Sequence, residues 1–299
     1  MRTAADLFLG TVKLGVPEYG FSSTAPVVSF DAQQFLCEAV KLGISRFDTS
    51  PRYGNSEEVI GQYIGQASSK PFVASKIDNL APNNSDTPGL MEKSVNDSLA
   101  KLHLSTLDIC YLHQNEMEII SDPYIHQGLS LLKEKGLVRQ AGASVYSKEE
   151  CSYAVDCGIF DVIQAPVSVF DLGFYNDFVL NKNPPVTLIA RSLLLQGILV
   201  NRRQIKGQIK QSDAVLQYLD NLDQLAKEAD MSTLDMALAF VYGLSGIDYY
   251  IIGTTSLENL KHNIECLKLE LPRHIISEIK VLAGTPKQWT NPRNWSLNG

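Results

Sequence analysis

Apolar residues follow two alternating patterns along the chain. Eight short runs have apolar residues in succession, as strands of a parallel sheet buried on both faces require. They are Leu7–Val12, Ile44–Asp48, Phe72–Lys76, Leu107–His113, Val138–Ala143, Val162–Ala165, Val186–Ala190 and Tyr250–Gly253. The longer segments between them have apolar positions at helical spacing, over Asp31–Lys41, Ser56–Gly65, Leu90–Leu102, Tyr124–Lys135, Lys148–Cys157, Ala214–Glu228 and Leu257–Leu267. A further helix is predicted after Pro272, over Arg273–Leu282.

Strands that alternate with helices favour a (β/α)8, or TIM, barrel over other α/β folds. Such a barrel typically takes ~250 residues, and the chain has 299. Because no linker or low-complexity segment divides it, we expect one barrel domain over residues 1–299, with an N-terminal hairpin-like segment and an appended C-terminal helix and tail. The alternative is a doubly wound sheet, but no GxGxxG motif follows the first run.

Charge and cysteine content narrow the class of protein. The net charge of -7 argues against a general nucleic-acid binder. No stretch approaches the ~20 apolar residues that cross a bilayer, and the N-terminus is a poor signal peptide. The cysteines are odd in number and have no CxxC spacing, which indicates reduced thiols. We therefore expect a soluble cytoplasmic enzyme, monomeric or a small homo-oligomer, with neither nucleic acid nor membrane as a partner.

Polar residues follow the predicted strands at their carboxyl ends, where barrel enzymes carry their active sites. Asp48 ends the second strand and Tyr53 follows it, while Lys76 ends the third strand and His113 the fourth. The remaining strands lead into Ser144, Gln164, Arg191-Ser192 and Gly253-Thr254-Thr255. These side chains therefore predict a site at one rim of the barrel.

Four of these side chains are chemically complementary. A free tyrosine titrates near pH ~10 and is a poor acid at neutral pH, but a nearby cation lowers its pKa. Lys76 can supply that cation, Asp48 can hold the ammonium, and His113 can donate a hydrogen bond to a carbonyl oxygen. Together they would protonate a C=O, which is one half of carbonyl reduction, while the hydride has to come from a nicotinamide. Each residue alone is more often structural, so the prediction depends on their occurrence at successive strand ends.

Several segments resemble the aldo-keto reductase family of NAD(P)H-dependent barrel oxidoreductases. FDTSPRYGNSEEVIG is similar to the family's stretch with an Asp and a Tyr five residues apart, VASKI to its lysine strand and DICYLHQ to its histidine strand. The similarity continues in order through GLVRQAGASVYS, DVIQAP, SLLLQG and IIGTTSLENLKHNI. It implies Tyr53 as the general acid/base and Lys76 as the group that lowers its pKa. It also implies Asp48 as the partner of Lys76 and His113 as the group that orients the carbonyl.

The resemblance also implies a nicotinamide cofactor that lies across the barrel mouth, with no Rossmann domain and no metal. Ser144 and Gln164 correspond to positions that bind the carboxamide, and Gly10 to the segment beside the nicotinamide ribose. The full set of implied cofactor contacts is Gly10, Thr11, Val12, Asp48, Ser144, Gln164, Arg191, Ser192, Leu193, Leu194, Gln196, Gly197, Gly253, Thr254, Thr255, Asn259 and Asn263.

Three departures from the family's pattern concern this cofactor. The usual Ser-Asn pair reads Ser144-Val145, so the carboxamide has to rely on Ser144 and Gln164. Arg191 stands where the family often has an aromatic residue against the nicotinamide, and a guanidinium can also stack on a ring. Hydroxyls and Asn259 replace the Lys or Arg that commonly binds a 2′-phosphate. NADP(H) is favoured on family habit, with NAD(H) as the alternative.

The expected substrate is a small, polar or sugar-like aldehyde or ketone. The loop Gln114–Pro123 is polar, and the tail offers Trp289 and Trp295 as walls of the pocket. A basic cluster can bind an anionic substrate, although such a cluster is more often a solvated helix face. Its residues are Arg202, Arg203, Lys206 and Lys210.

Two other functions are alternatives. A metal-dependent barrel hydrolase needs several ligands at the strand ends, but only Glu116 and Asp48 accompany His113 there, and the other histidines fall on predicted helices or loops. A regulatory subunit that binds nicotinamide and reports redox state, as some relatives of the family do, would keep the same four residues. Tight cofactor binding with slow turnover would favour that subunit.

Overall fold

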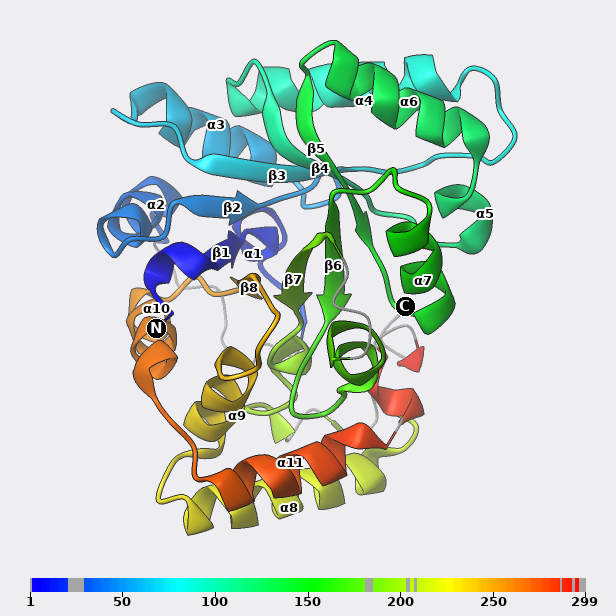
Figure 1. Ribbon diagram of the computed structural model, residues 1–299. Helices are drawn as coiled ribbons and strands as arrows, with labels where there is room; N and C mark the ends of the chain where they lie inside the picture. Colours follow the sequence, from blue (N-terminus) through cyan, green and yellow to red (C-terminus); the bar gives the residue numbers. More distant parts are fainter. Residues whose placement is uncertain are drawn as a thin grey trace.

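Eight parallel strands hydrogen-bond to one another in sequence order, and the last pairs with the first, so the sheet closes. The computed structural model describes residues 2–20, 30–180, 185–202, 205–206, 209–285, 287–291 and 294–295. The predicted (β/α)8 barrel is confirmed (Figure 1). Its strands are β1 (Leu7–Gly10), β2 (Arg46–Asp48), β3 (Phe72–Ile77), β4 (Leu107–Leu112), β5 (Val138–Ser144), β6 (Val162–Pro166), β7 (Thr187–Arg191) and β8 (Tyr249–Ile252).

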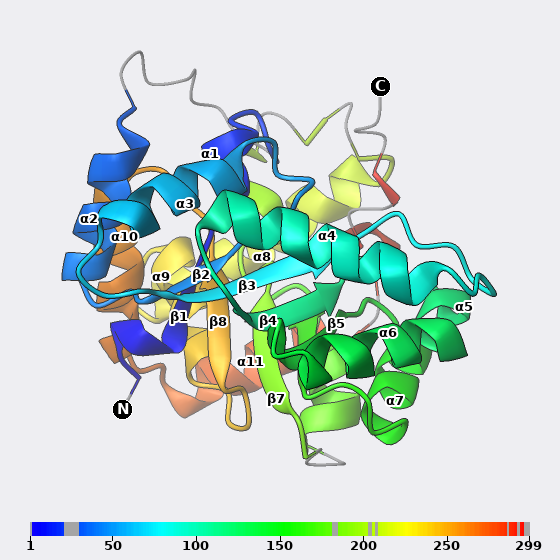
Figure 2. The ribbon, with the colours of Figure 1, turned by 90° about the horizontal axis from the view of Figure 1, so that it is seen from above.

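Helices form an outer layer because each turns an apolar face toward the strands. This layer contains α2 (Ala32–Lys41), α3 (Ser56–Gln66), α4 (Thr87–Leu102), α6 (Pro123–Glu134), α7 (Lys148–Asp156), α8 (Ser212–Glu228) and α10 (Leu257–Glu265). Helix α4 lies beside α6, and α2 lies beside α10 (Figure 2). The predicted appended helix is confirmed as α11 (Arg273–Gly284), which packs on α8 (Figure 1).

A second helix between β7 and β8, α9 (Thr233–Tyr242), is missing from the prediction. Every residue from Met236 to Tyr242 is buried, so this helix has no polar face and no amphipathic period to detect. The connection from β6 to β7 contains a π-helical turn, Tyr175–Leu180, and short helices α1 (Val12–Gly15) and α5 (Met117–Ile120) follow β1 and β4. None of the described helices combines the length and apolar character that a membrane crossing requires.

The prediction of an N-terminal hairpin-like segment is wrong for the described residues. Ala4–Asp6 form a short 3-10 helix that leads directly into β1. Its capping box explains the helix, because the Thr3 amide donates to Asp6 Oδ2 at 2.7 Å. The assignment of residues 1–299 to one domain stays a prediction.

Alternate residues of the strands point into the barrel and stack in layers. In the lowest layer, the Arg46 guanidinium lies 4.6 Å from the ring centre of Tyr249 and 4.8 Å from that of Phe72. Inside the barrel, an apolar cluster extends from this level toward the mouth and contains Phe8, Ala74, Ile109, Tyr111, Val162 and Ile189. The next inward positions, Asp48 on β2 and Lys76 on β3, reach the upper end. Because every second residue of a strand points inward, successive inward side chains run from the filled lower end of the barrel to its mouth.

Candidate active site

A buried ion pair lies at the upper end of β2 and β3. Lys76 Nζ is 2.7 Å from Asp48 Oδ1 and donates to the Thr49 carbonyl oxygen at 2.7 Å. The two side chains are only 2% and 6% exposed. Burial by itself lowers the pKa of a lysine, but Asp48 and Tyr53 outweigh this effect and hold the pKa of Lys76 above its ordinary value. The structure thus brings the expected partners together and keeps Lys76 charged.

Tyr53 lies beside this pair, in the turn between β2 and α3. Lys76 Nζ is 4.8 Å from the centre of the Tyr53 ring. Burial raises the pKa of Tyr53, and the charge of Lys76 acts in the opposite direction without reversing the shift. Lys76 therefore acts on Tyr53 in the direction expected from the sequence. Burial is the larger effect, so Tyr53 keeps its proton throughout the neutral range.

The turn that holds Tyr53 requires a glycine. Gly54 has a φ of +56°, and a Cβ placed on it would lie 2.3 Å from the carbonyl oxygen of Gly15. A side chain here would meet both a left-handed backbone and the neighbouring loop. The Tyr53 amide donates to the Ser50 carbonyl oxygen at 3.0 Å, which closes the turn. The local backbone thereby fixes Tyr53 over the mouth.

His113 follows β4 and lies edge-on to Tyr53. Their ring centres are 6.1 Å apart and their planes meet at 89°. His113 Nδ1 is 2.9 Å from Asp78 Oδ2 and 3.4 Å from Ser50 Oγ. Arg52 Nη1 lies 3.2 Å from the same Asp78 oxygen. The four expected catalytic side chains therefore meet at the mouth, with an additional carboxylate beside the histidine.

Ser144 and Gln164 form a hydrogen-bonded chain that ends at Asp48. Ser144 Oγ donates to Gln164 Oε1 at 3.2 Å, and Gln164 Nε2 donates to Asp48 Oδ2 at 2.8 Å. Both carboxylate oxygens of Asp48 are consequently engaged, one by Lys76 and one by Gln164. The side chains expected to bind the carboxamide lie beside the buried ion pair, and their contact with a cofactor stays a prediction.

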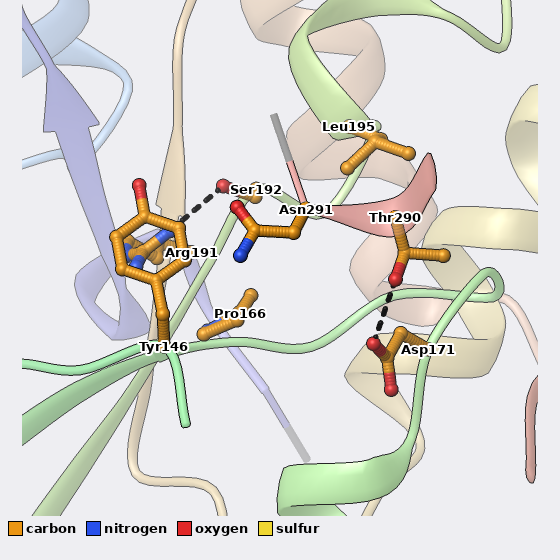
Figure 3. Close-up of a pocket in the computed structure, with 8 residues that line it drawn as sticks. All are labelled: Tyr146, Pro166, Asp171, Arg191, Ser192, Leu195, Thr290 and Asn291. Carbon is orange, nitrogen blue, oxygen red and sulfur yellow. Dashed lines mark hydrogen bonds between the residues drawn. The ribbon is translucent and has the colours of Figure 1, made fainter. Parts of the chain in front are cut away.

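A small pocket opens at the ends of β5, β6 and β7. The Arg191 guanidinium stacks on the Tyr146 ring, 4.0 Å from its centre (Figure 3). It also donates to the Val145 carbonyl oxygen at 3.0 Å. A second donation joins Arg191 to Ser192 Oγ at 3.2 Å. The stacking expected of Arg191 thus occurs against a tyrosine of this chain. The pocket is lined by Tyr146, Pro166, Asp171, Arg191, Ser192, Leu195, Thr290 and Asn291.

The C-terminal tail lines this pocket with the two residues after Trp289, not with its indoles. The Trp289 ring packs 5.7 Å from Phe170 and 5.4 Å from Tyr218, measured between ring centres. Trp295 Nε1 donates to the Trp289 carbonyl oxygen at 2.8 Å. Both indoles are buried because large rings gain most from removal from water. The prediction that they wall the pocket is wrong, and they anchor the tail instead.

The loops after β1 and β7 lie at the same rim. Thr11 Oγ1 donates to the Asp48 carbonyl oxygen at 2.9 Å, so the turn Gly10-Thr11-Val12 is fixed beside Asp48. After β7, the backbone is left-handed at Ser192 and Gln196, with φ of 59° and 54°. Gln196 Nε2 also donates to Tyr19 Oη at 3.1 Å. These bends shape the loop that contains the expected contacts Leu193, Leu194 and Gly197.

The turn after β8 leads into the N-terminus of α10. Ser256 caps the helix by accepting from the Asn259 amide at 3.2 Å, and Thr254 Oγ1 accepts from the Ser256 amide at 3.0 Å. One turn later, Asn263 Nδ2 donates to the Asn259 carbonyl oxygen at 2.6 Å. Gly253 and Thr255 lie in the same turn. Hydroxyls and free amides at a helix N-terminus favour an anion.

The basic cluster is divided by the structure. Arg202 pairs with Asp220 at 3.0 Å and with Asp223 at 2.7 Å, which ties its loop to α8. Lys206 and Lys210 are exposed, and Arg203 lies outside the described residues. Arg202 is therefore engaged in an ion-pair network. This contact favours a structural role for Arg202 over binding of an anionic substrate.

The hydrolase alternative fits this geometry poorly. Asp48 faces Lys76, and among the described residues no group of three His, Cys, Asp or Glu side chains with metal-ligand spacing includes Asp48 or His113. The ammonium of Lys76 would also repel a cation placed at Asp48.

Sequence reasoning missed Asp78 and Tyr146, for the same reason. Asp78 comes two residues after Lys76, and Tyr146 comes two residues after Ser144. Side chains two apart along a strand face the same side, so both continue an inward row just beyond the strand end. Extending the period of two by one step would have found them.

The aldo/keto reductase family model matches residues 6–283. The chain belongs to this family. Aldo-keto reductases are oxidoreductases that act on CH–OH/C=O groups with a nicotinamide cofactor, and the relatives found by sequence include oxidoreductases of this kind. This aldo-keto reductase is therefore an enzyme.

Its sequence relatives have different stated activities. The "NADH-specific methylglyoxal reductase" of Escherichia coli (strain K12) is 24% identical, over 88% of this chain and 93% of the relative. The "L-galactose dehydrogenase" of Arabidopsis thaliana is 25% identical, over 95% of this chain and 96% of the relative.

Solved structures share the fold of this aldo-keto reductase. The holo form of an aldo-keto reductase from Bacillus halodurans has a TM-score of 0.73 and 20% identity, over 96% of this chain and 95% of that one. An aldo/keto reductase from Klebsiella pneumoniae in complex with NADP and acetate has a TM-score of 0.68 and 19% identity, over 95% and 93%. These likenesses support the barrel assignment.

Proposed function

We propose that this aldo-keto reductase interconverts a small, polar or sugar-like aldehyde or ketone and its alcohol, with Tyr53 as the general acid/base. The observation that carries the proposal is the position of a protonated Tyr53 next to the charged, buried Lys76. In reduction, Tyr53 gives its proton to the carbonyl oxygen, and Lys76 stabilises the phenolate that remains. In oxidation, the same phenolate takes the proton back from the alcohol.

The side chains and backbone at the mouth suit a nicotinamide dinucleotide. Among the described residues, a Cβ placed on Gly253 would have one neighbour within 4 Å, the Gly10 carbonyl oxygen at 3.9 Å, so the backbone leaves room at the carboxyl ends of β1 and β8. The start of α10 offers hydroxyls and amides to a phosphate, and Ser144 and Gln164 offer groups that can bind an amide. A reduced nicotinamide bound there supplies the hydride that no side chain can provide.

We further propose a small preference for NADP(H) over NAD(H). The helix N-terminus favours the additional phosphate, but a terminus contributes only ~0.3–1 kcal/mol to binding a charge. Residues 253–256 contain no Lys or Arg, although a 2′-phosphate gains most from Arg. We therefore expect the two dissociation constants to differ by about fivefold or less, which a paired fluorescence titration with NADPH and NADH measures.

The polar groups of the pocket that Arg191 lines support the proposed substrate class. Its polar groups include the Asp171 carboxylate, which accepts from Thr290 Oγ1 at 2.9 Å, and the Arg191 guanidinium. Donors and acceptors of this kind match the hydroxyl groups of a sugar better than an apolar ring system. A screen of aldehydes, ketones and sugars with the preferred nicotinamide tests this class.

Replacement of Tyr53 by Phe tests the mechanism. We expect Tyr53→Phe to bind NADPH within about twofold of the parent and to lose ~10²–10⁴ in turnover, the usual contribution of a general acid. Tyr124→Phe, at an exposed position on α6, is the matched control and should keep full activity. Reduction by Tyr53→Phe at the parental rate would contradict the mechanism. Tight binding without turnover of any carbonyl by the parent would favour the regulatory subunit.

A further inference from the structure

Asp78 lies between His113 and Arg52 at the edge of the active site. Its carboxylate is 2.9 Å from His113 Nδ1 and 3.2 Å from Arg52 Nη1, and its side chain is 6% exposed. The Asn79 amide donates to its other oxygen, Oδ1, at 3.0 Å. The Asn79 amide therefore fixes Oδ1, while Oδ2 lies within ion-pair distance of both the imidazole and the guanidinium without an aligned hydrogen bond to either.

The carboxylate of Asp78 remains charged at neutral pH. Burial alone would favour its neutral form, but His113 and the Asn79 amide outweigh burial and hold the pKa of Asp78 below its ordinary value. A charged carboxylate only accepts hydrogen bonds. The ring nitrogen that faces it, His113 Nδ1, is therefore the nitrogen that carries a proton.

The position of this proton decides what His113 can do. With Nδ1 protonated, Nε2 on the far side of the ring is the nitrogen left for the substrate. A neutral ring then accepts a hydrogen bond from an alcohol, whereas donation to a carbonyl oxygen needs the imidazolium. The groups that face His113 are Asp78, Tyr53 and Ser50, and Asp78 is the charged one that can pair with that cation.

We propose that Asp78 is a positioning residue, which holds His113 with Nδ1–H toward the protein and Nε2 toward the substrate and pairs with the imidazolium that donates to the carbonyl oxygen. This inference rests on the proposed function. Asp78 touches neither the reacting atoms nor Tyr53 in this role, because it acts only through His113. Arg52 and the Asn79 amide hold Asp78 in turn.

A double-mutant cycle tests whether Asp78 acts through His113. Asp78→Asn keeps the size of the side chain but permits the wrong histidine tautomer, because the amide can also donate. We expect it to lower kcat of reduction by about tenfold or more, with KM and NADPH affinity within about twofold. In a His113→Ala background the same change should cost less than about twofold. An equal loss in both backgrounds, or no loss in either, would overturn the proposal.

The tautomer can be observed directly. Long-range 1H–15N NMR of the folded protein should show His113 protonated at Nδ1 in the parent and a redistribution of the proton toward Nε2 in Asp78→Asn. An unchanged His113 signature in the variant would contradict the proposal even if activity fell. Asp97→Asn, which removes the charge from an exposed ion pair with Lys93 on α4, is the matched control and should change neither readout.

Failure of this inference is distinguishable from failure of the proposed function. If Tyr53→Phe loses turnover while Asp78→Asn behaves like the parent, only the role of Asp78 is wrong. If Tyr53→Phe retains turnover, the proton donor is wrong, and the NMR measurement still reports whether Asp78 sets the tautomer of His113.

Discussion

At the centre of the mouth, Lys76 and Asp48 form a buried ion pair in which each charge balances the other. The two side chains are almost completely buried, so each charge depends on the other more than the charges of a surface pair do. Asp48 has a second partner in Gln164, whereas the hydrogen bonds of Lys76 go to Asp48 and to the Thr49 carbonyl oxygen. Removal of Lys76 therefore leaves a buried carboxylate without its cation.

We expect Lys76→Met to lower the free energy of unfolding by about 3–5 kcal/mol, the usual cost of breaking a buried pair. Urea denaturation measures this loss. The double variant Asp48→Asn/Lys76→Met should recover part of it, since neither charge then remains. Lys93→Met, in the exposed pair with Asp97, is the control and should change stability by less than about 1 kcal/mol. Equal losses for Lys76→Met and Lys93→Met would show that the pair contributes little.

Single residues show how far the sequence could lead at this scale. Asp48, Lys76 and His113 were predicted because strand ends converge at one rim of a barrel. The rise in the pKa of Tyr53 was not predicted. The sequence shows that Lys76 is available as a cation, but it does not show that Tyr53 is buried. The burial of Trp289 in the core was equally hidden, since it depends on the distant partners Phe170 and Tyr218.

Among the elements, α3 and α4 cross at a distance that only glycine allows. A Cβ placed on Gly61 of α3 would lie 1.9 Å from the Lys101 carbonyl oxygen of α4. A Cβ placed on Gly65, one turn later, would have its nearest neighbour at 3.4 Å, the Nδ1 atom of His103. The backbone of α4 therefore makes contact at one glycine and leaves room at the next. A single-sequence reading of helix periodicity gives no signal for such a contact.

Gly61→Ala should destabilise the protein by about 1–3 kcal/mol or more, because the added methyl group forces the helices apart. Gly65→Ala is the matched control, and it should be neutral or stabilising by up to ~1 kcal/mol, since alanine is the better helix former. Thermal and urea denaturation of the two variants measure the difference. If both variants were as stable as the parent, the close approach of α3 and α4 would be wrong.

The N-terminus of α10 provides an element-scale prediction on cofactor choice. In the proposed cofactor site, the turn after β8 offers hydroxyls at the place where a guanidinium would bind a 2′-phosphate. We expect Thr255→Arg to tighten NADPH binding relative to NADH by about tenfold or more, as a charge-assisted hydrogen bond adds roughly 1.5–3 kcal/mol. Paired fluorescence titrations measure both constants, and Thr255→Gln controls for side-chain length. A change of equal size for both nicotinamides would place the 2′-phosphate elsewhere.

At the scale of the whole molecule, several buried thiol and phenol groups of the described residues are held in their neutral form. Burial raises the pKa of the Cys110 and Cys266 thiols to about 12, from an ordinary value of 9.0. Burial also raises the pKa of Tyr250 to about 12. In the unfolded chain these groups ionise at lower pH than in the fold. Their contribution to stability is therefore complete below pH 9 and is lost as the pH rises toward 12.

We expect the free energy of unfolding to fall steadily above about pH 9, and less steeply for Cys110→Ala, which has one fewer buried thiol to ionise. Urea denaturation over a series of pH values gives both slopes. Cys37 is exposed, so Cys37→Ser should follow the parent throughout. Parallel slopes for the parent and Cys110→Ala would rule out a contribution from that thiol.

The barrel as a whole was predictable because its alternating pattern recurs along the chain, and repetition tolerates local error. The missing α9 did not change the topology, since the strands on either side were still recognised. What the pattern could not supply is the course of the chain outside the repeats. The anchored tail and the 3-10 helix before β1 depend on single contacts, such as Trp295 with Trp289 and Thr3 with Asp6.

The lowest layer of the barrel, where aromatic rings surround the Arg46 guanidinium, has a consequence for the order of events in a turnover. Because side chains fill the lower end of the barrel, ligands can reach the proposed site from the rim at the carboxyl ends of the strands. In the reaction proposed above, cofactor and substrate would therefore share this entrance, and the one bound deeper would have to bind first and leave last. The packing of Arg46 against its rings thus places the entrance to the proposed site at the rim.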